Sequence, residues 1–478
     1  MIENKKLSDE EFSQQRKEVL SMWHTGEHID LDEAIEYNKS LPSEKNFVRR
    51  IRRAASCGEI LATTGMGKST VVEQIELLQH VENEGDAEIL AISPDSMTRF
   101  NKFDEVQKHL EESIKTKRSK LNGLPVVNVG VSGIRQIVES VKSPIALRGG
   151  MVDGRLLSET LFAGGCVSYG PDWGMNFWQH SATAPYDYVV QSHQYIGRLM
   201  GLYEEQGIPV MAGVQGLYGA GIPPSLQSAN IVISAILLTE QGVKNLNIKC
   251  VGNGNLAQDV ASSSARESVL RYYLDKFEYN DVVMSKNLSF SLMSYPAEVA
   301  SSLAVIFMNT LMARLIGATI SDIRTMAEAK AIPTKENIAD TLKIAKVMQN
   351  YLQHQEVEVP KEELELQIQM EEKEIKAIID KVLEFGDGDI LIGAAKAIEV
   401  GVLDNPFAAN RAAVGKVLGV KDNKGAIRYY DTGNLPFSKE IVDYHKEKIA
   451  ERESKRGIKV GYDTIIDDLF AVSRGYLV

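Results

Sequence analysis

Residues 62–69 read ATTGMGKS, which is close to the pattern of a phosphate-binding loop. Such a loop uses glycines so that backbone N–H groups can face a phosphate, a lysine for the β- and γ-phosphates, and a serine or threonine for Mg²⁺. Gly67, Lys68 and Ser69 supply these groups, but Ala62 stands where the stricter pattern has its first glycine. The chain also offers no clear strand of four apolar residues ending in aspartate. The motif alone therefore leaves nucleotide binding open.

The bulk composition narrows the classes of partner. A length of 478 residues is enough for two or three domains, or for one large barrel with additions. A net charge of −12 argues against a general nucleic-acid binder and against an anionic membrane surface. The cysteines at 57, 166 and 250 form no CxxC pair, and the charged N-terminus lacks a signal core. We expect a reduced, cytoplasmic protein in which Cys166 and Cys250 are small buried residues.

Between about 58 and 323, short apolar runs alternate with helical patterns, which indicates a parallel sheet. The runs are β-branched and continuous in apolarity, as is typical of strands buried on both faces. Eight or nine repeats favour a closed (β/α)8 barrel of the TIM type over a doubly wound open sheet, which remains the alternative. The expected strands are 59–63, 87–93, 125–131, 144–149, 165–170, 209–214, 246–252, 281–285 and 318–323, with helices at 134–141, 195–207 and 225–242.

The α/β barrel, expected over 46–330, has additions at both ends. Residues 1–45 predict an N-terminal helical extension, in which a helix begins at Asp30 or Asp32 and stops at Pro42. The apolar stretch 302–320 contains Asn309 and Arg314, so it predicts a buried helix running into a strand. Residues 331–478 predict a C-terminal helical and mixed α+β lobe. Its charged run at 335–385 is expected to be a helix with a solvated face.

Stretches spread over nearly the whole chain resemble the large (epsilon) subunit of glutamate mutase, also called methylaspartate mutase. They are collinear with that family, and their combination is specific. The longest are VLSMWHTGEHIDLDEAIEYNKSLP at 19–42, RLLSETLFAGGCVSYG at 155–170, RLMGLYEEQGIPV at 198–210 and IDDLFAVSRGYLV at 466–478. The resemblance implies a (β/α)8 barrel in which the phosphate-loop pattern is only the end of an early strand.

The resemblance also implies an isomerase that moves a carbon fragment between adjacent carbons by radical chemistry. The family default is the conversion of glutamate to 3-methylaspartate with adenosylcobalamin. This chain has no DxHxxG motif, by which small cobalamin-binding subunits present a histidine to cobalt. The resemblance therefore implies a cofactor shared with such a subunit, in a heterotetramer built on a homodimer. A related acid substrate, a nucleotide-binding protein and an inactive scaffold subunit are the alternatives.

Arginines are the residues expected to bind a carboxylic-acid substrate, because the guanidinium fork can donate two parallel hydrogen bonds to a carboxylate. The family uses three. Arg99 and Arg148 match two of them, but the third falls at Gly65, where Lys68 could supply a substitute charge.

Other positions of the family's substrate pocket differ. Gly170 stands where the family has the glutamate that contacts the substrate ammonium, although Tyr169 before it is retained. Either Asp172 takes over that contact or the contact is gone. The family's tyrosines are replaced near Phe177 and His180, and a family histidine is Gly149 here. The resemblance thus implies a retained barrel with a rewritten pocket, whose catalytic set we expect to be Arg99, Arg148, Asp172, Phe177 and His180.

For the cofactor, Gly67 and Asn122 match positions that the resemblance places near the adenosyl group. Arg324 stands where the family has a lysine, and Glu328 matches its glutamate, so both are expected to bind ribose hydroxyls. His24 and His28 have i,i+4 spacing without the glutamate of an HExxH motif, so no metal site is expected there.

Overall fold

A computed structural model describes residues 1–478 of the chain. Nine of its strands are parallel, and the last two form an antiparallel hairpin near the C-terminus. The strands are β1 (Leu61–Thr63), β2 (Gly65–Met66), β3 (Leu90–Ile92), β4 (Ile145–Leu147), β5 (Ser168–Tyr169), β6 (Met211–Val214), β7 (Asn245–Gly252), β8 (Val283–Phe290), β9 (Ile320–Asp322), β10 (Leu418–Lys421) and β11 (Ile427–Asp431).

The parallel strands form two sheets. One has six strands in the order β1-β9-β8-β7-β6-β5, and the other has three in the order β2-β3-β4. Only Thr64 separates β1 from β2, so the two sheets continue one another at that point. No hydrogen-bonded ladder joins β4 to β5, and the structure therefore shows a curled parallel sheet without confirming a closed (β/α)8 barrel. Because the strands are parallel, their carboxyl ends lie at the same edge.

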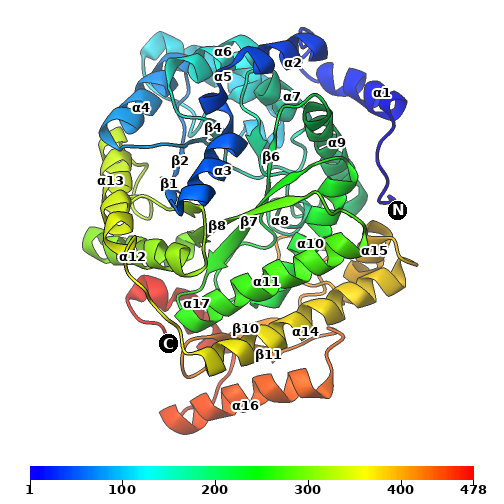
Figure 1. Cartoon of the computed structure of the whole chain (residues 1–478), viewed down its shortest axis with the longest axis vertical. Coiled ribbons are helices and arrows are strands. Elements are labelled where there is room, and N and C mark those ends of the chain that lie inside the picture. Colours follow the sequence, from blue (N-terminus) through cyan, green and yellow to red (C-terminus); the bar gives the residue numbers. More distant parts are fainter.

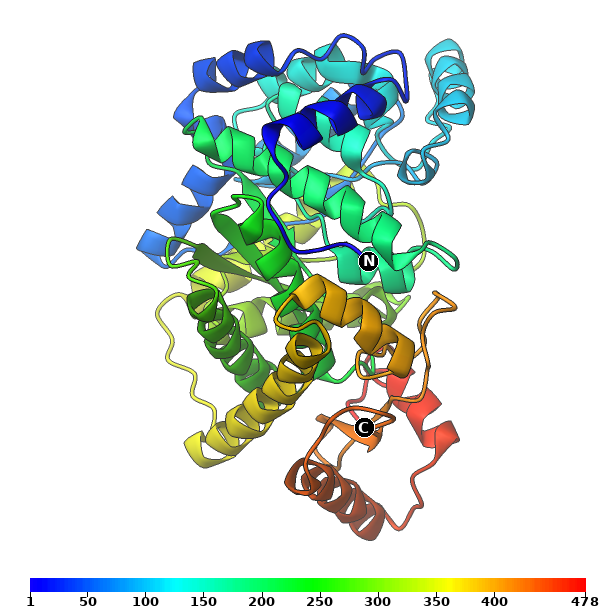
Figure 2. The same cartoon turned by 90° about the vertical axis from the view of Figure 1, so that its right-hand side faces the viewer.

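Helices surround these strands, as Figure 1 shows. Those up to residue 315 are α1 (Asp9–Leu20), α2 (Leu31–Ser40), α3 (Phe47–Cys57), α4 (Val71–Glu84), α5 (Phe103–Thr116), α6 (Val126–Ser140), α7 (Arg155–Ala163), α8 (Trp173–Gln179), α9 (Tyr186–Glu205), α10 (Pro224–Glu240), α11 (Leu256–Lys276) and α12 (Val299–Leu315). The later ones are α13 (Lys335–Leu352), α14 (Lys361–Phe385), α15 (Ile390–Val400), α16 (Lys439–Arg456) and α17 (Tyr462–Phe470). The segment coloured orange to red, which holds the hairpin and α16, lies at one end of the molecule (Figure 2).

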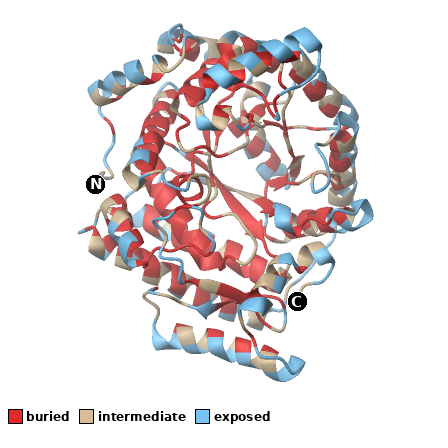
Figure 3. Ribbon diagram, turned by 180° about the vertical axis from the view of Figure 1, so that it is seen from behind, coloured by how far each residue is buried: buried red, intermediate tan, exposed pale blue.

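Local sequence explains where several helices begin. The Asp30 side chain accepts a hydrogen bond from the backbone N–H of Glu33 and caps α2, as predicted. Thr70 caps α4 in the same way through the N–H of Glu73. The apolar stretch at 302–320 is the predicted helix α12 followed by β9. Helix α10 is buried on nearly all sides, which matches its mostly apolar sequence (Figure 3).

One predicted strand is wrong. Residues 125–131 lie in α6, which begins after Pro125 and is kinked at Gly130 with a φ of 65°. A short continuous apolar run cannot be distinguished from a buried helix by periodicity alone, and burial of Val126, Val127 and Ile134 accounts for the apolarity here. All the other expected strands are present.

The charged run at 335–385 forms α13 and α14, as predicted, but α14 is not simply solvated on its charged face. Glu371 and Glu374 are buried against α10, α11 and α16, where Ser262 donates to Glu371 and His445 contacts Glu374. Burial raises the pKa of Glu371 to about 8. Cys166 and Cys250 are buried free thiols, as predicted. No helix combines the length and apolarity needed to cross a membrane.

Candidate active site

A cavity of about 280 Å³ opens at the carboxyl edge of the parallel strands. Residues of all nine parallel strands line it. We call the part lined by β1, β7, β8 and β9 its floor, and the part lined by residues that directly follow β3, β4, β5 and β6 its walls. The charged residues lining it are four cations and two carboxylates: Arg99, Arg148, Lys249, Arg324, Asp322 and Glu328. His180 also lines the cavity, and its imidazole is neutral at pH 7 because its pKa is lowered to about 4. The cavity therefore carries an excess of two positive charges.

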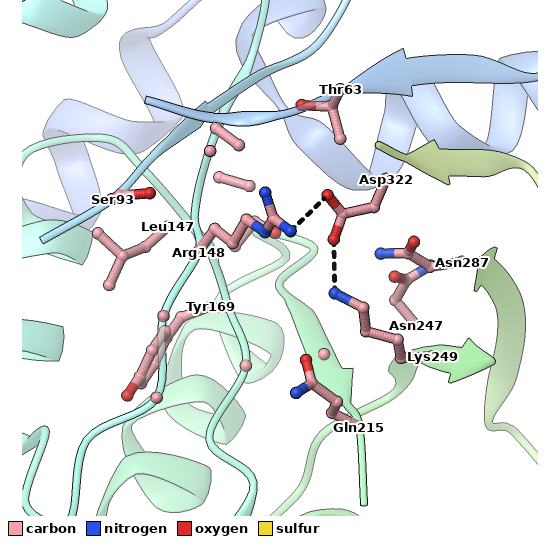
Figure 4. Close-up of a pocket in the computed structure, with 18 of the residues that line it drawn as sticks. Thr63, Ser93, Leu147, Arg148, Tyr169, Gln215, Asn247, Lys249, Asn287 and Asp322 are labelled. Carbon is pink, nitrogen blue, oxygen red and sulfur yellow. Dashed lines mark hydrogen bonds and ion pairs between the residues drawn. The ribbon is translucent and has the colours of Figure 1, made fainter. Parts of the chain in front are cut away.

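At the floor, one carboxylate holds two cations (Figure 4). Asp322, the last residue of β9, is almost fully buried; its Oδ1 lies 3.1 Å from Nη2 of Arg148 and its Oδ2 lies 2.5 Å from Nζ of Lys249. Burial alone would raise the pKa of Asp322, but Arg148 and Lys249 hold it below its ordinary value. Burial lowers the pKa of Lys249, and Asp322 opposes that shift. The three side chains form one connected group.

The other arginine that the sequence predicted lies on the wall. Arg99 belongs to the short helix η2 (Thr98–Phe100) after β3, and its Nε donates to the carbonyl of Pro94 at 3.2 Å. Its guanidinium lies directly over Gly149: a Cβ at Gly149 would come within 2.9 Å of Nη2 of Arg99. The absence of a side chain at Gly149 thus makes room for Arg99 in the cavity.

His180 and Tyr169 complete this side of the cavity. Nδ1 of His180 lies 2.8 Å from Oδ1 of Asn176, and burial together with the nearby Arg99 lowers the pKa of His180 to about 4. The imidazole is therefore neutral at pH 7. The hydroxyl of Tyr169 is buried without a hydrogen-bond partner, and burial raises its pKa. Both side chains can hydrogen-bond a ligand without adding charge.

Arg324 and Glu328 form a third polar group at the rim. Nη1 of Arg324 lies 2.5 Å from Oε1 of Glu328, and its Nη2 lies 3.5 Å from the hydroxyl of Tyr218. Burial alone would lower the pKa of Arg324, but Tyr218 and Glu328 raise it above the ordinary value. Nε of Arg324 is buried and has no acceptor. The group presents both donors and acceptors to the cavity.

Comparison with known proteins decides the family of the chain. Residues 41–478 match the family model of the methylaspartate mutase E chain (MutE). The chain belongs to this family. Over its full length it is 37% identical to the glutamate mutase epsilon subunit of Desulfitobacterium hafniense, of which it covers 99%. It is 38% identical to that of Treponema denticola over 99% of this chain and 98% of the relative. The corresponding subunit of Halobacterium salinarum is 31% identical over the whole chain.

Membership of the methylaspartate mutase E chain family makes the chain a carbon-skeleton isomerase. Of the site residues that the sequence predicted, the cavity brings together Arg99, Arg148, Tyr169, His180, Arg324 and Glu328. The remaining ones, which do not line it, are Gly67, Lys68, Asn122, Asp172 and Phe177.

Asp172 has a structural task in this family member. It is fully buried and caps α8 through the N–H of Met175, while its Oδ2 accepts the N–H groups of Gln215 and Gly216 at 2.6 Å each. Burial raises the pKa of Asp172 to about 6 against these hydrogen bonds. Both oxygens of Asp172 accept backbone N–H groups, so the carboxylate is not directed into the cavity.

Phe177 and Asn122 are also turned away from the cavity. Phe177 is buried on α8 against Trp173, Trp178 and Tyr186. The exposed Asn122 accepts the N–H of Ser96 in the loop after β3.

The backbone and side-chain groups of the phosphate-loop pattern make hydrogen bonds and packing contacts within the chain. Gly67 packs against backbone, since a Cβ there would lie 2.7 Å from Cα of Gly123. The N–H of Lys68 donates to Gln74, and the N–H of Ser69 donates to Ser119. The Ser69 hydroxyl is fully buried and exchanges hydrogen bonds with the backbone of Leu121, so it cannot reach a metal ion. This segment ends a strand and begins α4, as the resemblance implied.

Sequence reasoning missed Lys249 and Asp322. The signal was present in both cases. Lys249 is a lysine in the middle of the apolar strand LNIKCVG, and Asp322 interrupts the apolar strand ATISDI. A charge inside a strand that is buried on both faces is costly unless it is paired, so such a residue points to an interior ion pair or site.

Proposed function

We propose that the chain is the catalytic subunit of an adenosylcobalamin-dependent mutase that rearranges the carbon skeleton of glutamate or of a related amino or dicarboxylic acid. The observation that carries this proposal is the cationic cavity, in which the two family arginines that the sequence retains lie with an excess of two positive charges. Arginine and lysine are suited to carboxylates, and the enclosure strengthens these interactions by excluding water.

The residues at the rim fit the adenosyl group of the cofactor. A ribose diol needs both donors and acceptors, and Arg324, Glu328 and Tyr218 supply both, including the unpartnered Nε of Arg324. Four glycines of the lining leave space in the cavity that side chains would otherwise fill. They are Gly149, Gly150, Gly170 and Gly213, the last two facing each other. When bound, adenosylcobalamin would supply the radical that takes a hydrogen atom from the substrate. The chain binds and orients the substrate and encloses it away from water.

In this proposal Arg99 and Arg148 hold the substrate carboxylates. The neutral His180 and Tyr169 orient the substrate by hydrogen bonds, because neither adds a charge that would compete with the arginines. The family match is the reason to retain Gly67 and Asn122 as residues near the cofactor, and Lys68 as a nearby cation, although none lines the cavity in the chain alone.

The cofactor is proposed to be shared with a small cobalamin-binding subunit carrying DxHxxG. In this chain the sequence Asp-x-His occurs at His445, but this side chain is buried against Glu374 and no glycine follows at the required position. Exposed apolar side chains follow β3, β8 and β9 at the edge where the cavity opens, and they suit a protein partner; they are Phe100, Leu292, Met293 and Ile332.

We further propose a heterotetramer built on a homodimer, in the cytoplasm. A closed (β/α)8 barrel over 46–330 is part of the same proposal, with β4 beside β5 as the closing pair and with additions at 1–45 and 331–478. The adjacency of β4 and β5 supports this closure.

The proposal is tested by reconstituting the chain with a cobalamin-binding subunit and adenosylcobalamin, and by recording electron paramagnetic resonance after adding glutamate or other acids. A signal that depends on the acid is expected. A complex that assembles but gives no signal with any acid would show an inactive scaffold instead.

A further inference from the structure

Lys249 is a buried cation at the floor of the cavity that the proposed function leaves without a role. It comes from the middle of β7, and Figure 4 shows it pointing toward one oxygen of Asp322 while Arg148 approaches the other. Asn287 pairs with Lys249 across β7 and β8 and lines the same cavity. Since residues that pair across neighbouring strands share a face, the side chain of Lys249 belongs to the cavity and not to the helical layer outside.

The space of the lost family arginine is already filled. A Cβ at Gly65 would lie 3.0 Å from Cδ and 3.1 Å from Nη1 of Arg148, and 2.6 Å from Oγ of Ser93. The side chain of Arg148 thus crosses the position that a third arginine would need. Lys68 does not line the cavity, so it does not replace that cation either.

The polar atoms around Lys249 are arranged for an anion. Asp322 is engaged by both Arg148 and Lys249, and Glu328 is engaged by Arg324, so no cavity carboxylate is free. The Thr63 hydroxyl, which can donate a hydrogen bond to an anion, is buried in the lining without a partner. Such buried groups are costly unless a bound molecule or water satisfies them. The floor is therefore a polar site with a surplus cation.

We propose that Lys249 is a specificity-determining residue that binds one carboxylate of a dicarboxylic substrate, in place of the arginine missing at position 65. Asp322 is a positioning residue that holds Lys249 and Arg148 on either side of that carboxylate. This inference rests on the proposed function and names the part of the cavity that selects a doubly charged acid.

The test compares glutarate with its monoamide, which differ only in whether the second end is charged. Binding of each to the reconstituted complex is measured by calorimetry for the wild type, Lys249→Met and Lys286→Met. Lys286 is the matched control because it lies on β8 next to Asn287 but faces outward to Glu267. Lys249→Met is expected to reduce the preference for glutarate by about tenfold or more, as for loss of a charge-assisted hydrogen bond. Lys286→Met is expected to keep that preference.

A purely structural role for Lys249 would lower thermal stability but leave the preference for glutarate unchanged, and that result would overturn the inference. If Lys249→Met does not fold, Lys249→Gln removes the charge but keeps a donor for Asp322, which also stays paired with Arg148, and the same loss of preference is expected. Lys249→Arg is expected to keep the preference. A wild-type complex that binds no acid would contradict the proposed function itself, whereas equal preferences in the two methionine variants would contradict only this inference.

Discussion

The side chain of Arg148 lies across Gly65, so closely that a Cβ on the glycine would be 3.0 Å from Cδ of the arginine. This contact links Gly65 of β2 to an arginine that directly follows β4. Without a side chain at position 65, Arg148 can turn over the strand end toward Asp322. The missing side chain at position 65 and the orientation of Arg148 are thus structurally linked.

Gly65→Ala is expected to displace Arg148 and to weaken binding of the acid, because the new methyl group would meet Ser93 Oγ at 2.6 Å as well as Arg148. KM should rise by about tenfold, the value of one charge-assisted hydrogen bond, with a smaller change in kcat. Steady-state kinetics of the reconstituted complex measure both. Gly461→Ala, where nothing lies within 4 Å, is the control. An unchanged KM for Gly65→Ala would show that Arg148 does not hold the acid.

Gly170→Glu should restore a preference for acids that carry an ammonium. A Cβ at Gly170 would lie 3.3 Å from the carbonyl oxygen of Gly213, so a side chain is tolerated after a small shift. A new carboxylate would pair with the substrate ammonium, and affinity for glutamate relative to glutarate should rise about tenfold. Calorimetry of both ligands tests this, with Gly170→Gln as the uncharged control. An equal gain with glutamine would mean that charge is not the cause.

His180 should make stability depend on pH between about 6.5 and 4. Its pKa falls to about 4 in the folded chain because of burial and Arg99, whereas an unfolded chain keeps the ordinary value of 6.5. Within that window the unfolded state binds a proton that the folded state does not. The stabilisation is complete above the unfolded pKa and is lost as the pH falls toward the folded pKa, by at most about 1.4 kcal/mol per pH unit.

Urea unfolding of the wild type and His180→Gln at pH 7, 6 and 5 measures this dependence. The variant should show the flatter decline of the free energy of unfolding. Because His180 is partly exposed, the difference should be below the limit for one full proton. Parallel declines in the two proteins would show that the imidazole titrates normally.

Alanine substitutions at two adjacent residues of the phosphate-loop pattern should change the free energy of unfolding by different amounts. Ser69→Ala removes a buried hydroxyl that serves both the N–H and the C=O of Leu121, and should lower the free energy of unfolding by about 1–3 kcal/mol. Lys68→Ala should leave it nearly unchanged, since the side chain forms no ion pair. Neither ATP nor GTP should bind the wild type in calorimetry. Nucleotide binding that Lys68→Ala abolishes would revive the nucleotide-binding interpretation.

The positions of most parallel strands were predictable because buried parallel strands leave continuous apolar runs bounded by turns. The run at 125–131 has the same composition but is a helix, since burial of one face of α6 demands the same residues. The buried Glu371 and Glu374 could not be predicted from a charged run, because only the packing of α10, α11 and α16 encloses them.

For the site, arginines at strand ends were predictable because parallel strands bring their carboxyl ends together. Asp172 also follows a strand, but its carboxylate turns to backbone N–H groups of the next strand's loop, which no sequence pattern specified. Lys249 lies in mid-strand, where charge is rare, and its role depends on Asp322 across the sheet. Pairing between distant strands is what the sequence alone could not supply.

The central claim, a carbon-skeleton mutase acting at this cavity, is tested most directly by proton NMR of the reconstituted complex incubated with glutamate and related acids. The account predicts that a branched-chain isomer of at least one acid accumulates, and that Arg148→Met, in a complex that still assembles, abolishes it. No isomer from any acid, or unchanged turnover by Arg148→Met, would contradict the account.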